Sequence, residues 1–178
     1  MRVIGGEFRS RRLKTPHGET VRPTPDRLRE ALFNILSPRI EDVVFLDAYA
    51  GCGSVGIEAI SRGARHAIFL EKSRAALRCL EENIAALEID GRCEVHAGNA
   101  ASVITKFEAD IVFLDPPYPR ETEYQNCLEN LGAEPRPLVI VQHASKFTRH
   151  LKDSYGQLQR VRLLSQGDNT LSFFEPRG

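Results

Sequence analysis

The stretch that decides the fold is Leu46-Asp47-Ala48-Tyr49-Ala50-Gly51-Cys52-Gly53-Ser54-Val55-Gly56, which continues a short apolar run at residues 43–46. Gly51, Gly53 and Gly56 fit G-x-G-x-x-G, the pattern of a tight strand-to-helix turn where backbone can approach a ligand. Glu71 stands 20 residues after Gly51, at the end of the next apolar run. An acidic residue at that distance binds a ribose in dinucleotide-binding folds, although a turn without any ligand can carry the same glycines.

After this turn, short apolar runs alternate with amphipathic helical patterns. The runs lie at residues 43–46, 67–70, 93–96, 111–114 and 138–141, and residues 73–87 carry a clear helical pattern. Strands that are apolar on both faces and alternate with helices indicate a parallel sheet covered on both sides. Residues 157–164 and 171–174 flank a polar segment and predict a hairpin. We therefore expect a doubly wound, Rossmann-like α/β fold with a mostly parallel sheet and an antiparallel edge hairpin.

The first 40 residues have a different pattern. Residues 2–4 and 8–15, joined through Gly5-Gly6, predict a β-hairpin with basic residues on both faces of its second strand, and therefore an exposed arm. The sequence Thr24-Pro25-Asp26 then predicts a helix start with Thr24 as N-cap, and Pro38 ends that helix. We expect residues 1–40 to form this basic arm and helix as an extension of one domain, and residues 41–178 to form the catalytic domain.

Composition limits the class of protein. The chain has 178 residues with 42% hydrophobic and 27% charged residues, which excludes a disordered tail, a collagen repeat and a coiled coil. The 24 Lys and Arg balance the 24 Asp and Glu, but not evenly along the chain. Residues 1–40 carry a net +5, residues 41–135 a net −9 and residues 136–178 a net +4. Basic ends around an acidic middle indicate a nucleic-acid surface, although chance gives such a distribution about as readily.

Other features exclude some sites and locations. The four cysteines form no C-x-x-C pair, so we expect no metal site. The first residues lack the apolar core of a signal peptide, and no apolar run approaches the roughly 18 residues of a membrane span. We therefore expect a cytoplasmic protein with reduced thiols and no membrane partner. No self-complementary apolar stripe is evident, so we expect a monomer.

Asp47 limits the kinds of ligand that the glycine turn can bind. It stands four residues before Gly51, at the end of the first strand. A carboxylate there suits an ammonium group and is unfavourable beside a pyrophosphate. S-adenosylmethionine carries an ammonium group and also a ribose, whose hydroxyl groups can donate hydrogen bonds to Glu71. The Asn99 carbonyl oxygen and the Ala100 N–H can meet the adenine, although a helix N-cap explains Asn99 equally well.

The fourth strand ends in Ile111-Val112-Phe113-Leu114-Asp115-Pro116-Pro117-Tyr118, which predicts methyl transfer to the exocyclic amine of a base. The lone pair of that nitrogen is delocalised into the ring, so acceptors must hold both N–H bonds and turn the lone pair toward the methyl group. The Asp115 carboxylate and the Pro116 carbonyl oxygen can do this, in a turn that the prolines make stiff. Tyr118 offers a face on which the base can stack.

With these residues in place, the chain resembles the bacterial small-subunit (16S) ribosomal RNA guanine-N2 methyltransferases of the RsmD type. The resemblance includes residues 2–9, 22–36 and 167–171 as well as the glycine turn and Asp115 to Tyr118. It implies S-adenosylmethionine as methyl donor, a guanine N2 of small-subunit ribosomal RNA as acceptor, and an assembling or assembled ribosomal subunit as partner. It also implies that Arg22 and Thr24 lie near the cofactor. Tyr49, Cys52 and Asn99 stand where the family more often has Phe, Ser and Asp.

Three other functions remain as alternatives. One is an adenine or cytosine amino-methyltransferase of DNA or of another RNA, which has the same fold and Asp-Pro-Pro-Tyr turn. Another is an NAD-dependent oxidoreductase, which leaves that turn without a role. The last is an RNA-binding module without turnover. For the leading hypothesis, we expect the RNA contacts to come first from the arm, through Arg9, Arg11, Arg12 and Lys14.

Overall fold

The predicted α/β architecture is confirmed by the computed structural model, which describes residues 1–16, 24–117, 121–133 and 137–178. A single eight-stranded sheet has the order β3-β2-β1-β4-β5-β8-β7-β6. The strands are β1 (Val44–Asp47), β2 (His66–Glu71), β3 (Cys93–Ala97), β4 (Ile111–Leu114), β5 (Leu138–Ala144), β6 (Ser154–Tyr155), β7 (Leu158–Gln166) and β8 (Asn169–Pro176). Strands β1 to β5 are parallel, and β8, β7 and β6 add an antiparallel edge.

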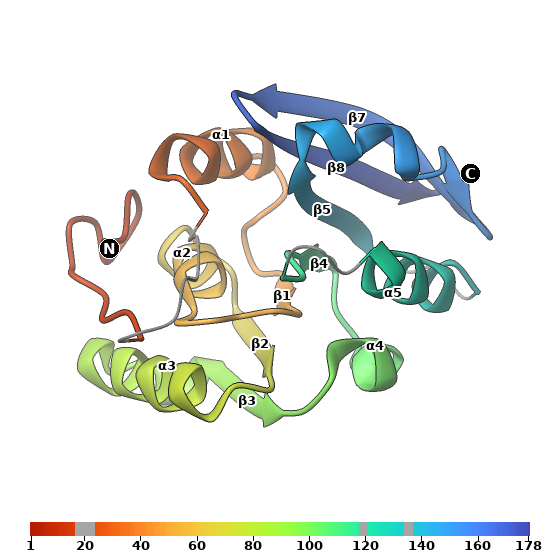
Figure 1. Ribbon diagram of the computed structural model, residues 1–178. Coiled ribbons are helices and arrows are strands. Elements are labelled where there is room, and N and C mark those ends of the chain that lie inside the picture. The colour runs from red at the N-terminus through yellow and green to blue at the C-terminus, as the bar shows by residue number, and fades with distance from the viewer. Residues whose placement is uncertain (17–23, 118–120, 134–136) are drawn as a thin grey trace.

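Helices cover both faces of the sheet (Figure 1). They are α1 (Asp26–Leu36), α2 (Ser54–Ser61), α3 (Arg74–Leu87), α4 (Ala100–Val103) and α5 (Glu121–Ala133), with the 3-10 helices η1 (Asp90–Arg92), η2 (Ile104–Lys106) and η3 (Ser145–His150). Residues of α1, α2 and α3 form one hydrophobic cluster with the sheet, and residues of α4, α5 and η3 form a second. In the part of the chain that the structure describes, no helix is long and apolar enough to cross a membrane.

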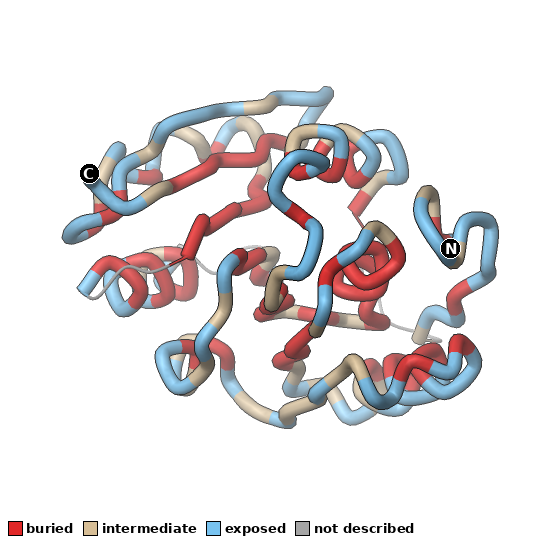
Figure 2. Tube along the Cα trace, turned by 180° about the vertical axis from the view of Figure 1, so that it is seen from behind, coloured by how far each residue is buried: buried red, intermediate tan, exposed pale blue. Residues whose placement is uncertain are grey.

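Helix α2 is buried along its whole length (Figure 2). It packs so closely that a Cβ on Gly56 would lie 2.3 Å from the Phe69 ring, and one on Gly53 would lie 2.3 Å from a Leu80 methyl group. Gly53 also has a φ of 84°, which side chains other than glycine rarely adopt. Two of the three glycines in the turn are therefore required by the packing of α2 on β2 and α3.

The start of α1 differs from the prediction. Its N-cap is Pro25 without a side-chain hydrogen bond, so the prediction that Thr24 caps the helix is wrong. The Thr24 hydroxyl instead donates to Gln142 Oε1 at 2.9 Å, and both side chains are buried. A hydrogen bond to β5 has replaced the local cap because the residue is drawn into the interior.

The N-terminal arm is also less exposed than predicted. Arg2 and Arg12 form a single antiparallel bridge, and Val3 and Leu13 are buried in the main hydrophobic cluster. The fully buried Glu58 of α2 anchors the arm by accepting the Ile4 and Gly5 N–H groups at 2.8 Å. The basic side chains of the arm are exposed as expected, but the arm itself is packed on the domain, because side chains of the helices satisfy its backbone.

Glu58 also balances buried positive charge. Arg62 Nε lies 2.7 Å from Glu58 Oε1, and the fully buried Arg29 has its Nε 3.8 Å from Glu58 Oε2. A buried carboxylate with these partners is costly to remove, because its loss leaves a buried guanidinium and two arm N–H groups without an anion.

We predict that Glu58→Gln lowers the free energy of unfolding by about 3 kcal/mol, the usual cost of breaking a buried ion pair. Urea denaturation measures this loss, and hydrogen exchange is expected to show faster exchange in residues 1–15. Glu81→Gln, at an exposed position of α3, is the matched control and changes stability by less than about 0.5 kcal/mol. Equal stability of the two variants would contradict the anchoring role.

Candidate active site

A cavity of about 790 Å³ opens at the carboxyl ends of the central strands. From β1 the chain proceeds outward to β2 and β3, then returns to β4 and β5 on the other side, so the strand order reverses between β1 and β4. Ligands of open α/β sheets bind at such a switch point. The cavity wall brings together most of the residues that the sequence analysis selected, namely Thr24, Asp47, Gly51, Glu71, Asn99, Ala100, Asp115 and Pro116.

Asp47 ends β1 at the centre of the cavity wall and is almost fully buried. Its Oδ2 accepts the Gly56 N–H at 3.0 Å, which ties the carboxylate to the first turn of α2. Burial raises the pKa of Asp47 to about 7, despite the opposing effect of this hydrogen bond. A cationic ligand bound beside Asp47 would therefore lower its pKa and favour the ionised carboxylate.

Glu71 ends β2 and organises the glycine turn. Its Oε2 accepts the Gly51 N–H, and its Oε1 accepts the N–H groups of Lys72 and Ser73, each at 2.8 Å. A Cβ on Gly51 would meet no atom within 4 Å, so this residue is glycine because of its φ of 56° and faces open space. The side chain of Glu71 is thus fixed at the cavity edge by three backbone donors.

This arrangement argues against a dinucleotide. A pyrophosphate at a glycine turn is bound by free backbone N–H groups at a helix N-terminus. Here the Gly51 and Gly56 N–H groups already donate to Glu71 and Asp47. Two carboxylates therefore stand where a pyrophosphate needs donors, and the site favours a positively charged ligand.

Asn99 acts as a helix cap, one of the two roles that its sequence position allowed. Its Oδ1 accepts the Ala101 N–H at 3.0 Å and it is the N-cap of α4. The cap fixes the carboxamide on the cavity wall, beside the buried Ala100. An adenine contact would have to share that oxygen with the backbone.

Asp115 and Pro116 follow β4 and face the same cavity. Burial, and then the negative charge of Asp47, raise the pKa of Asp115 to about 7. The Tyr124 hydroxyl lies 3.2 Å from the Gln142 carbonyl oxygen and 3.5 Å from the Pro116 carbonyl oxygen, and donates toward both. Tyr124 thus connects the turn after β4 to β5.

Sequence reasoning missed several residues of the cavity wall. Tyr124 has an aromatic side chain on α5 with no local motif, so only the fold reveals its position under Pro116. Gln142, Glu123 and Lys146 also line the cavity. Their one sequence signal was proximity to the ends of β4 and β5, where a parallel sheet gathers its ligand contacts. Arg22 and Tyr118 lie outside the described residues.

The basic residues of the arm are not brought into the cavity. Arg11 Nη2 donates to the Ala86 carbonyl oxygen at 2.9 Å, and Lys14 Nζ lies 2.8 Å from Glu82. Arg9 and Arg12 are exposed. Helix α3 begins beside the carboxyl end of β2 and runs back toward the amino edge of the sheet, so its last turn lies far from the cavity. Arg11 therefore contacts the end of α3 opposite to the site.

Comparison with known proteins identifies the family of the chain. A family model described as conserved hypothetical protein 95 matches residues 1–175. Ribosomal RNA small subunit methyltransferase D of Escherichia coli strain K12 is 43% identical over 136 residues, covering 74% of this chain and 68% of that protein. Putative rRNA methyltransferase YlbH of Bacillus subtilis is 31% identical over 192 residues, covering 100% of both.

Solved structures place the fold among the methyltransferases. The putative methyltransferase yhhF from Escherichia coli has a TM-score of 0.85 at 31% identity, over 100% of this chain and 98% of that chain. A putative RNA methyltransferase from Pyrococcus horikoshii shares the fold, with a TM-score of 0.73 at 19% identity over 93% of each chain. The fold is thus the Rossmann-like class I methyltransferase fold. Because the family model spans nearly the whole sequence, the chain belongs to the family of conserved hypothetical protein 95, the RsmD-type ribosomal RNA small subunit methyltransferases.

Proposed function

We propose that this protein transfers a methyl group from S-adenosylmethionine to the exocyclic N2 of a guanine in small-subunit ribosomal RNA. Family membership supports the methyltransferase activity and the RNA class. The observation that carries the proposal is that Asp115 and the Pro116 carbonyl share one cavity wall with Asp47 and Glu71. Acceptors for an amine and carboxylates for a cationic donor therefore lie in the same space.

The residues present fit S-adenosylmethionine. A cavity of about 790 Å³ has ample room for a molecule of this size and for a base. Asp47 would hold the ammonium group, the free lone pairs of Glu71 would accept ribose hydroxyls, and Asn99 and Ala100 would border the adenine. Gly51 and Thr24 also line the cavity, whereas Gly53 does not line it and packs against Leu80 instead. When bound, the donor supplies a methyl group already activated on a sulfonium.

The turn after β4 would prepare the amine. The Asp115 carboxylate and the Pro116 carbonyl oxygen would each accept one N–H of the guanine amine, which turns the nitrogen lone pair toward the cavity. The proline rings limit the backbone, and Tyr124 contacts the Pro116 carbonyl, so the acceptor directions are set before substrate arrives. Asp115, with its raised pKa, is also placed to take the proton that the amine loses. Tyr118 stays a proposed stacking surface for the base.

The proposed partner is small-subunit ribosomal RNA, within an assembling or assembled subunit. The protein would act as a monomer in the cytoplasm. Exposed Arg9 and Arg12, with Arg11 and Lys14, stay candidates for RNA contacts, and Arg11 would make its contact at the amino edge of the sheet. A particle much larger than the enzyme can reach both edges at once.

The direct test is methylation of under-methylated small subunits with labelled S-adenosylmethionine, followed by mass mapping of the nucleoside. Label in the N2 of one guanine is the expected result, and label in an adenine or cytosine amine instead would contradict the proposed acceptor. Asp115→Asn is expected to lower kcat about 100-fold or more, because it removes a carboxylate acceptor at the amine. Its affinity for S-adenosylhomocysteine is expected to change little. Asp90→Asn, exposed in η1, is the control and retains activity.

We predict that kcat/KM rises with pH and levels off above about pH 7. The pKa of Asp115 is about 7, and its carboxylate accepts the amine N–H best when ionised. The pKa of Asp47 is also about 7, so the affinity for the cationic donor is expected to rise over the same interval. Steady-state rates and calorimetric titration between about pH 5.5 and pH 8.5 measure the two effects. A flat profile for both would contradict the assignment of these carboxylates.

The same pKa values predict a stability effect in the protein without ligand. Native Asp115 retains its proton up to about pH 7, whereas the unfolded chain loses it near the ordinary pKa of about 3.9. Stability therefore falls as pH rises between these values. Asp115→Asn is expected to increase the free energy of unfolding, by about 2 kcal/mol more at pH 8 than at pH 5. Urea denaturation at the two pH values measures this difference, and an equal gain at both would show that Asp115 is not shifted.

A further inference from the structure

The cavity extends past the proposed cofactor and amine sites to a rim formed by η3 and the turn between β7 and β8. Lys146 of η3 and Asp168 of the turn both line this end of the cavity. Since η3 follows β5 directly, it stands at the carboxyl edge of the sheet, the same edge as Asp115. A nucleotide whose base enters the cavity must carry its backbone past one part of the rim.

Helix η3 is rigidly attached to the site. Its Phe147 is buried and packs on Tyr124, with ring centroids 5.1 Å apart, and on His150 at 5.3 Å. Ser145 fixes the other end, because its N–H donates to the Asp168 carbonyl oxygen at 2.8 Å and its hydroxyl donates to the Gly167 carbonyl oxygen at 3.1 Å. A charge on η3 is therefore held at a defined position relative to the turn after β4.

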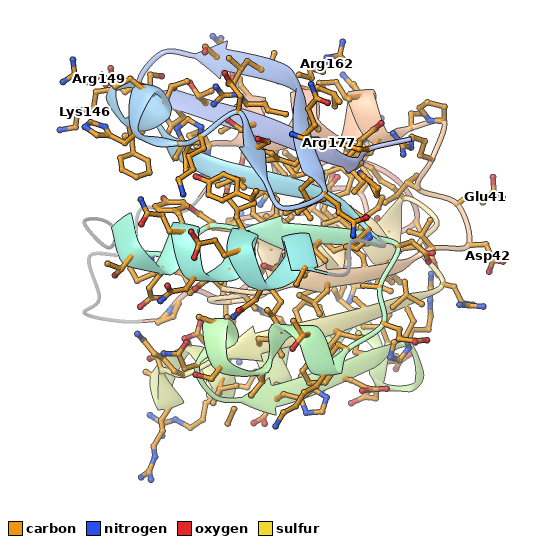
Figure 3. All side chains as sticks on the ribbon, turned by 90° about the vertical axis from the view of Figure 1, so that its right-hand side faces the viewer. Glu41, Asp42, Lys146, Arg149, Arg162 and Arg177 are labelled. Atoms are coloured by element: carbon orange, nitrogen blue, oxygen red, sulfur yellow. The ribbon has the colours of Figure 1, made fainter. Side chains whose placement is uncertain are left out.

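The exposed face of η3 is basic. Lys146, Arg149 and His150 are exposed, and Arg149 forms no ion pair with any residue that the structure describes. Figure 3 shows Lys146 and Arg149 together on one side of the molecule, opposite Glu41 and Asp42, which precede β1 and mark the amino edge. The carboxylate of Asp168 lies on the same rim, so the surface is basic without being uniformly positive.

The arm is positioned differently. Arg11 contacts Ala86, which lies twelve residues after the first residue of α3. At a rise of 1.5 Å per residue, that is about 18 Å along the helix from its start at the cavity edge. Glu7 of the arm pairs with Arg92 of η1, just before β3, at the same amino edge. The tip of the arm therefore lies at the amino edge of the sheet, whereas Met1 at the start of the arm lines the cavity.

We propose that Lys146 and Arg149 bind the RNA phosphates next to the target nucleotide, and that η3 contacts RNA closer to the site than Arg9 and Arg11 of the arm do. This inference rests on the proposed function for its choice of partner. RNA fits the surface because two cations flank a cavity that must receive a base, and phosphate contacts set the register of a bound strand. The Asp168 carboxylate, on the same rim, would repel phosphate from the cavity itself.

The test compares three double variants for binding to small-subunit RNA over a series of salt concentrations. Lys146→Ala with Arg149→Ala is expected to weaken binding about tenfold and to reduce the salt slope by about 0.7 to 0.9 per lost phosphate contact. Arg162→Ala with Arg177→Ala is the matched control, because both arginines are exposed and lie away from η3 (Figure 3). Arg9→Ala with Arg11→Ala tests the distant part of the arm and is expected to have the smaller effect.

Kinetics add a second readout. Loss of phosphate contacts is expected to raise KM for RNA with little change in kcat, since these contacts are equal in ground and transition states. The single variant Arg149→Ala is measured as well, because Lys146 lines the cavity and its loss could also affect the cofactor site. The affinity of Arg149→Ala for S-adenosylhomocysteine must equal that of the unmodified protein. An effect confined to the arm variant, or an equal loss in the control pair, would overturn the proposal.

The experiment also separates this proposal from the one on which it rests. Binding is measured without methyl transfer, so an inactive wild-type protein would refute the proposed function while RNA affinity still tests the surface. Loss of binding to the ribosomal particle but not to naked RNA would assign η3 to a protein partner and refute the RNA contact.

Discussion

The rest of the site depends on two carboxylates that hold the glycine turn. Asp47 accepts the Gly56 N–H and Glu71 accepts the Gly51 N–H, so the ends of β1 and β2 are both tied to the turn between them. Close packing of α2 makes this possible, because Gly56 has no side chain and lets the helix lie directly against the Phe69 ring. The same bonds decide the chemistry of the ligand. Backbone donors that would bind a phosphate are used internally, and carboxyl groups line the cavity instead.

Burying these carboxyl groups has a thermodynamic cost in the protein without a cationic ligand. Asp47 and Asp115 both have a pKa near 7 because burial disfavours their ionised forms. A ligand with an ammonium and a sulfonium group would stabilise the ionised forms of both carboxyl groups. Part of its binding energy would therefore come from offsetting the unfavourable burial of these charges in the free protein. Binding and ionisation are then linked, and the pH dependence of each follows from the other.

The sequence allowed prediction of the strands, their parallel arrangement and most residues of the cavity wall, because periodicity and strand-end position are local signals. Contacts between distant segments could not be predicted. Thr24 stands at a typical helix-cap position, yet its hydroxyl donates a hydrogen bond to Gln142, more than a hundred residues away. Glu58 looks like any helical glutamate, yet it anchors the arm. Tyr124 has no motif at all. Each of these depends on which elements the fold places side by side.

The charge pattern also shows that position in the sequence does not predict position in the fold. The sequence correctly indicates basic ends and an acidic middle, but charge along the chain does not give position on the surface. Arg11 of the arm contacts the last turn of α3, about 18 Å along that helix from the cavity edge. The Debye length at physiological salt is about 8 Å, so charges at that separation act only weakly on a phosphate at the cavity mouth. Lys146 lines the cavity and Arg149 lies one turn further along η3, so the phosphate contacts proposed there would act at short range. The distance of a charge from the cavity, more than the number of charges on a segment, therefore decides which residues can act on a phosphate at the cavity mouth.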